Sequence, residues 1–189
     1  MRSSRSLASV ALIGACLLAG CGALAQQQPG TLAIRAARLA PAADAPVLVL
    51  SLDCRLSGPM QDALDHGIPL TLLITVDAGR WNFVRSDAHA ERRVELRYFP
   101  LSRRYQLRDL DTATADVRSF ATPGYLSASL NSLRLPLSPA FASLPQGTRM
   151  HVDAGLETAK LPGALRLPAL FEPAWRLAAA EFTWQLPAG

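Results

Sequence analysis

The sequence of 189 residues has few cysteines and no apolar run long enough for a comfortable membrane span. Its longest uncharged apolar run is residues 7–20. Because no other run approaches the length of a membrane span, a multi-pass membrane protein is excluded. Of the three cysteines, Cys16 and Cys21 fall in or beside this run, so Cys54 has no partner for an intramolecular disulfide in a processed chain. The fold must therefore depend on its core, which 50% hydrophobic residues can supply.

The chain also lacks a large excess of charge. It has 19 Lys and Arg against 15 Asp and Glu, and without Arg2 and Arg5 of the N-terminal segment 17 basic residues remain. A domain this close to neutral does not have the electrostatic footprint of a nucleic-acid-binding protein. Lys160 is the only lysine, and this arginine bias favours a GC-rich genome over phosphate binding.

Familiar catalytic motifs are absent as well. The sequence has no Gly-x-Ser-x-Gly elbow, no glycine-rich phosphate loop and no Cys-x-x-Cys pair, so we predict neither an enzyme nor a cofactor. Cys54 lies in an apolar strand pattern and is expected to be a buried small hydrophobe. His151 and Asp153 would share one strand face, but a zinc site needs a third protein ligand and none is evident. His66 falls at a helix end, where a cation favours the helix dipole.

The N-terminus has the features of an export signal, because Arg2 and Arg5 precede the apolar run. Two cleavage sites are open. The sequence Leu-Ala-Gly-Cys at residues 18–21 has the spacing of a lipoprotein signal, whereas Ala-Leu-Ala at residues 23–25 suits ordinary signal peptidase. Both sites place the protein on the periplasmic side of the envelope, as an outer-membrane lipoprotein or as a soluble periplasmic protein.

We predict that Cys21 is lipidated, which would anchor the protein to a membrane. Gly22 follows this cysteine, which resembles outer-membrane sorting more than inner-membrane retention. The chain then divides into a signal peptide (1–25, or 1–20 for a lipoprotein), a polar tether (26–30) and a single β-rich domain (31–189).

Short segments of strand character dominate that domain. Fourteen prolines interrupt every long helical pattern, and apolar residues alternate or form short β-branched runs. The expected strands are residues 31–35, 46–52, 68–76, 93–99, 104–108, 150–154, 165–167 and 175–186, with 68–76 central because its apolar run is nearly continuous. This pattern predicts a mainly β fold, an antiparallel β-sandwich that is immunoglobulin-like in general architecture, with two short helices.

The two helices are expected after residues 57 and 122. Ser57 can cap the first helix and Gly67 can end it. The second helix opens at Thr122-Pro123 and would continue to Pro136, because its leucines repeat at helical spacing. These leucines are Leu126, Leu130 and Leu133.

Residues 93–108 predict an antiparallel hairpin with a defined register. Folding the chain about residues 100–103 puts Tyr98 opposite Tyr105. The same register pairs Leu96 with Leu107 and Glu95 with Arg108, and it places both tyrosines on the core face.

Arginine is concentrated around this hairpin. Eight arginines fall between residues 80 and 108, namely Arg80, Arg85, Arg92, Arg93, Arg97, Arg103, Arg104 and Arg108. Arg97, Arg103, Arg104 and Arg108 form the candidate interaction surface, for an anionic partner such as lipid headgroups or an acidic protein. The alternative is an ordinary mixed-sign face, because four acidic residues are interleaved with the eight arginines, namely Asp87, Glu91, Glu95 and Asp109.

Several short motifs follow one another along the chain in a characteristic order and spacing. They are Ala63-Leu64, Gly67-Ile68-Pro69-Leu70, Arg80-Trp81, Leu96-Arg97-Tyr98, Leu101-Ser102-Arg103-Arg104-Tyr105, Leu161-Pro162, Leu165-Arg166-Leu167-Pro168, Trp175 and Trp184. On these residues the chain, from about residue 31 to 186, resembles a Gram-negative envelope family known as domain of unknown function 4390. The resemblance implies no catalytic residue, and it implies a sensor histidine kinase of the nitrogen-regulation type as a candidate signalling partner.

The sequence thus favours a non-enzymatic envelope domain that interacts with another envelope protein. The alternative is a lipoprotein that holds an apolar ligand in a groove between sheet and helices. An enzyme is the least favoured class, because no nucleophile–base pair or metal set is present in the sequence pattern.

Overall fold

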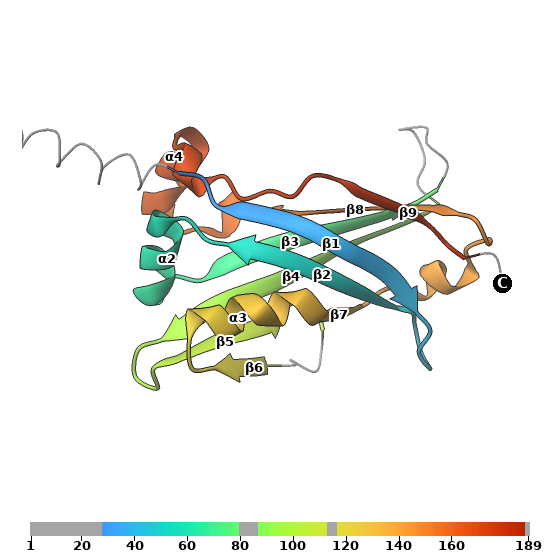
Figure 1. The fold of residues 1–189 in the computed structure, drawn as a ribbon, viewed down its shortest axis with the longest axis horizontal. Coiled ribbons are helices and arrows are strands. Elements are labelled where there is room, and N and C mark those ends of the chain that lie inside the picture. Colours follow the sequence, from blue (N-terminus) through green and yellow to red (C-terminus); the bar gives the residue numbers. More distant parts are fainter. Residues whose placement is uncertain (1–27, 80–86, 113–116, 188–189) are drawn as a thin grey trace, which may run out of the picture.

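The computed structural model describes residues 28–79, 87–112 and 117–187. These residues form nine strands, three α-helices and four short 3-10 helices (Figure 1). The strands are β1 (Thr31–Ala40), β2 (Val47–Arg55), β3 (Leu70–Ala78), β4 (Ala88–Phe99), β5 (Arg104–Asp109), β6 (Val117–Phe120), β7 (Leu133–Pro136), β8 (Arg149–Leu156) and β9 (Phe182–Gln185). The helices are α2 (Gly58–Asp65), α3 (Pro123–Ser129), α4 (Gly163–Phe171), η1 (Leu130–Ser132), η2 (Pro139–Ser143), η3 (Thr158–Lys160) and η4 (Pro173–Trp175). Within the described ranges, no helix has both the length and the apolar character needed to cross a membrane.

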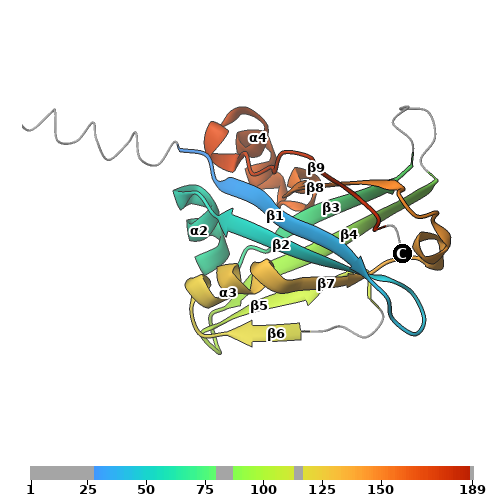
Figure 2. The same cartoon turned by 45° about the vertical axis from the view of Figure 1, so that its right-hand side comes forward.

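The strands form two antiparallel sheets, as the sequence predicts for a sandwich. One sheet has three strands in the order β1-β2-β7, and the other has six in the order β6-β5-β4-β3-β8-β9. Figure 2 shows the smaller sheet lying across the larger one, with the helices at the end and along the side of the pair. Strand β3 lies between β4 and β8, which confirms that the most apolar segment is central.

The hydrophobic core fills the space between the two sheets. Alternate residues of each strand point inward, so a period of two in the sequence becomes one apolar face. From β2 these inward residues are Leu48, Leu50, Leu52 and Cys54, and from β3 they are Leu70, Leu72, Ile74, Val76 and Ala78. Burying each leucine or isoleucine contributes roughly 1.5–3 kcal/mol to the stability of the fold. Because both sheets bury side chains in the same core, this burial holds them together.

The β4–β5 hairpin has the predicted register. Tyr98 pairs with Tyr105, Leu96 with Leu107 and Glu95 with Arg108. The centroids of the two tyrosine rings are 4.7 Å apart. Tyr105 is buried and Tyr98 is half-buried, so the core-face prediction holds more fully for Tyr105.

Helix α2 begins and ends where the sequence predicts. The Ser57 side chain accepts a hydrogen bond from the backbone N–H of Met60 at 3.3 Å. Gly67 follows the helix with a φ of +81°, a left-handed conformation that favours glycine. The helix buries its apolar face, which consists of Met60, Ala63 and Leu64.

The second predicted helix is too long. Helix α3 ends at Ser129, a 3-10 turn follows, and the chain becomes strand β7 at Leu133. Leu133 and Leu135 are buried while Arg134 is exposed, which is a strand alternation, and β7 pairs with β2. Leu126 and Leu130 do form the buried helical stripe, but Leu133 reaches the same core from a strand.

Two strand predictions near the C-terminus are also wrong. Residues 165–167 lie in α4, a third helix that the sequence analysis did not expect. The predicted strand 175–186 is shortened to β9 (Phe182–Gln185), because Trp175 belongs to η4. Between the two, the chain pairs with β8 through an isolated bridge between Ala178 and Gly155. Prolines interrupt helical patterns in the sequence, yet Pro168 lies inside α4.

Candidate interaction surface

The outer face of the six-stranded sheet is the side that points away from the core. On β4 and β5 the inward residues include Val94, Leu96, Tyr105 and Leu107. The alternate residues must point outward, since successive strand side chains face opposite sides of a sheet. They are Arg93, Glu95, Arg97 and Phe99 on β4, and Arg104, Gln106 and Arg108 on β5.

Three of the four predicted surface arginines share this outer face. Arg97 pairs with Gln106, which places Arg104 and Arg108 at the two diagonal positions. Residues at such diagonal positions lie roughly 7–8 Å apart. Arg103 lies in the adjoining turn with a φ of +52°. All four arginines are exposed, and the guanidinium of Arg97 lies 4.9 Å from the centroid of the Phe99 ring.

These four arginines have no carboxylate partner in the described part of the chain. Every ion pair found there involves other residues. Glu95 lies opposite Arg108 in the register, but the two side chains do not form an ion pair. The outer face near the hairpin turn is therefore basic, with side chains open to an anionic partner.

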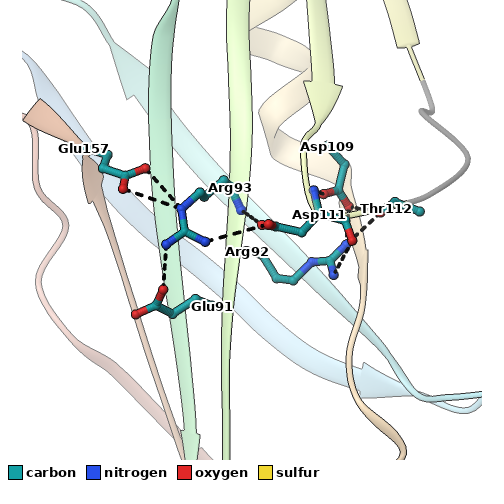
Figure 3. Close-up of polar contacts among 7 residues, drawn as sticks. All are labelled: Glu91, Arg92, Arg93, Asp109, Asp111, Thr112 and Glu157. Atoms are coloured by element: carbon teal, nitrogen blue, oxygen red, sulfur yellow. Dashed lines mark hydrogen bonds and ion pairs between the residues drawn. The ribbon is translucent and has the colours of Figure 1, made fainter. Parts of the chain in front are cut away.

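Arg92 does not belong to this surface, although it is one of the eight clustered arginines in the sequence. It points inward, and an Nη of Arg92 donates to Asp109 Oδ2 at 2.6 Å and to Thr112 Oγ1 at 2.7 Å (Figure 3). Only 12% of the Arg92 side chain and 10% of the Asp109 side chain are exposed. Asp109 also accepts hydrogen bonds from the Asp111 backbone N–H and from the Thr112 hydroxyl.

Arg93 joins three segments on the outer face (Figure 3). Its guanidinium forms ion pairs with Glu91 at 2.7 Å, Glu157 at 3.3 Å and Asp111 at 3.7 Å. Its backbone N–H donates to Asp111 Oδ2 at 2.6 Å. The hydrogen bond to Glu91 is the largest cause of its raised pKa, and the charges of Glu157 and Asp111 add to it. Asp109 thus pairs with Arg92, while Glu91, Asp111 and Glu157 pair with Arg93, and none of these contacts was predicted from the sequence.

A second group of ionisable residues lies on the outer face over β3, β4 and β8. His89 contacts Asp77 at 2.9 Å, and His151 contacts Glu181. Asp153 has a raised pKa, caused first by desolvation and then by the negative charges of Asp77 and Glu181. His151 and Asp153 share a face as predicted. Among residues 28–79, 87–112 and 117–187, however, no three His, Cys, Asp or Glu side chains are arranged to hold a metal ion.

Two other predicted positions have structural roles. Cys54 is buried in β2, and its burial raises the thiol pKa to about 12, which confirms a small core hydrophobe. His66 lies at the C-terminal end of α2, where its ring nitrogen Nδ1 contacts the Asp62 carbonyl oxygen at 2.6 Å. The predicted lipidation site Cys21 lies outside the described residues, as do Arg80, Trp81 and Arg85.

Comparison with known proteins identifies the family of this chain. No curated protein and no solved structure matches this chain. A family model described as Domain of unknown function (DUF4390) matches residues 30–185, which extend from the residue before β1 to the last residue of β9. The chain therefore belongs to the DUF4390 family.

Proposed function

We propose that this protein is an exported, non-enzymatic envelope domain that binds an acidic protein through Arg97, Arg103, Arg104 and Arg108. The single observation that carries the proposal is that these arginines are exposed and free of carboxylate partners within the described ranges. Elsewhere on the same hairpin, Arg92 and Arg93 form ion pairs with acidic side chains.

The chemistry of arginine supports an acidic protein as the partner. Each guanidinium offers a planar fork of donors that can bind a carboxylate through two parallel hydrogen bonds. Like charges at diagonal strand positions repel one another, and a partner with several carboxylates would relieve that repulsion. Phe99 beneath Arg97 adds an aromatic ring, and arginine and aromatic residues are frequent in interface hot spots.

The export signal and Cys21 support a location on the periplasmic side of the envelope. The external part of a sensor histidine kinase is our candidate partner. This choice rests on the family resemblance, and the basic surface restricts it to a kinase with an acidic external surface.

Co-purification from envelope extracts tests the proposal. The full-length protein and an Arg104→Glu/Arg108→Glu variant would be isolated with bound proteins, which are identified by mass spectrometry. We expect the wild type to retain one acidic envelope protein reproducibly and the variant to lose it, because two carboxylates replace two cations at the contact.

The matched control is Arg38→Glu/Arg134→Glu. Both residues are exposed, and both lie opposite Val49 in the other sheet, so they point away from the core on the far side of the sandwich. This variant has the same change in net charge and is expected to retain the partner. Loss of the partner in both variants, or in neither, would contradict the proposed surface.

A further inference from the structure

Helix α4 presents three large apolar side chains to solvent. Leu167 is 66% exposed, Leu170 is 62% exposed and Phe171 is 76% exposed. On the other side of the helix Ala169 is buried and Leu165 packs partly against the core. The helix thus has more apolar surface than the core uses, and we call Leu167, Leu170 and Phe171 the α4 patch.

The α4 patch lies at the end of the sandwich where the described chain begins. Figures 1 and 2 both show the start of β1 beside α4. Gly30 approaches so closely here that a Cβ on it would lie 2.8 Å from Leu177 Cδ1. Leu177 is the second residue after η4, and η4 packs against α4.

The length of the preceding segment limits how far this end can stand from a membrane. Seven residue-to-residue steps lead from Cys21 to Gln28, where the described part starts. Fully extended, they span at most about 25 Å. Attachment through Cys21 would therefore hold the end that carries α4 close to the bilayer, whichever way the rest of the domain points.

Charged residues beside the patch suit an anionic membrane surface. Arg166 lies in α4 itself, Lys160 and Arg176 flank the helix in the sequence, and all three are exposed. Glu172 is the acidic residue next to the end of the helix. Basic residues bordering an apolar helix face are typical of segments that lie in the headgroup region of a bilayer.

From these observations we infer that the α4 patch docks on the lipid bilayer and orients the domain over it. Leu167, Leu170 and Phe171 enter the boundary between headgroups and acyl chains, while the neighbouring cations contact anionic headgroups. This inference goes beyond the proposed protein contact, because it uses a different element and does not require a protein partner.

Fluorescence quenching tests the inference. The full-length chain carrying Phe171→Trp would be inserted into phosphatidylethanolamine–phosphatidylglycerol vesicles, with and without bromine on the acyl chains. We expect brominated lipid to remove most of the fluorescence that this tryptophan adds to the parent protein. The control is Ala140→Trp, an exposed position in η2 at the opposite end of the molecule, where we expect no quenching (Figure 1).

A second variant separates the patch from its tether. Adding Leu167→Asp/Leu170→Asp to Phe171→Trp should abolish the quenching, and circular dichroism would confirm that each variant is folded. Three results would overturn the inference. They are an unquenched Phe171→Trp, equal quenching at Ala140→Trp, and quenching that survives the two aspartates, which would mean that the tether alone brings this end close to lipid.

Discussion

Two groups of arginines on the β4–β5 hairpin differ in what surrounds them. Arg92 and Arg93 meet Asp109, Asp111 and Glu157, whereas Arg97, Arg104 and Arg108 meet no carboxylate in the described ranges. The first group connects the hairpin to β8 and to the segment after β5. The second group is left available for other molecules. The role of an arginine therefore depends on its face and on distant acids more than on its clustering in the sequence.

The buried pair provides the largest test of this difference. Asp109→Ala would leave the Arg92 charge nearly buried without a counter-charge, and we expect it to lower the free energy of unfolding by about 3–5 kcal/mol. Urea unfolding followed by circular dichroism measures this loss.

The double variant Arg92→Met/Asp109→Leu is the control for the buried pair. It removes both charges and keeps apolar volume, so it should recover most of the lost stability. A double variant as unstable as Asp109→Ala would show that the damage came from packing or from the other hydrogen bonds that Asp109 accepts, rather than from the unpaired charge.

Neighbouring residues in β4 provide the next test, because Tyr98 points toward the core and Arg97 points toward solvent. We expect Tyr98→Ala to cost about 2 kcal/mol, less than a fully buried aromatic because Tyr98 is half-buried. Arg97→Ala should stay within about 0.5 kcal/mol, as an exposed residue without an ion pair. Urea midpoints of the two variants measure the difference, and equal losses would mean that Arg97 is structural like Arg92.

The smallest effect concerns the contact that holds the hairpin against α2. Tyr105 donates a hydrogen bond to Asp65 Oδ1 at 2.6 Å, and its pKa is raised to about 12, first by burial and then by this carboxylate. The raised pKa means that Tyr105 stabilises the fold fully below pH 10 and loses this contribution as the pH rises toward 12.

Asp65→Asn tests this contact. We expect the variant to lower the pKa of Tyr105 part of the way toward 10, because burial still acts. Phenolate absorbance measures the titration, with Tyr105→Phe identifying the late step. An unchanged late step in Asp65→Asn would contradict a contribution from the carboxylate.

Much of the β4–β5 region follows from alternation in the sequence. The period of two that placed Leu96 and Tyr98 on the core face fixes the observed register, because a shift by one residue would bury Arg97. The same alternation places Arg92 and Asp109 on the core face. An inward Arg two residues before Val94 and an inward Asp opposite Val94 were thus a readable signal of the buried pair.

Other elements depend on partners that are distant in the sequence. Leu133 fits both a helical stripe with Leu126 and a strand alternation with Leu135, and only the free edge of β2 decides between them. Likewise Leu165 and Leu167 alternate around Arg166 as a strand would, but these residues form a helix at the end of the sandwich. The network around Arg93 includes Glu157, which is 64 residues away, so local patterns could not predict it.

The edges of the sheets have a consequence for self-association. The six-stranded sheet ends in β6 and β9, and each has only four residues. Strand β1 is the long edge of the smaller sheet, and its pairing with β2 is interrupted by a register shift between Ile34 and Ala36. Short edges and bulges offer few consecutive unpaired backbone N–H and C=O groups to another chain. Copies of this domain at high local concentration would therefore resist joining edge to edge into extended sheets.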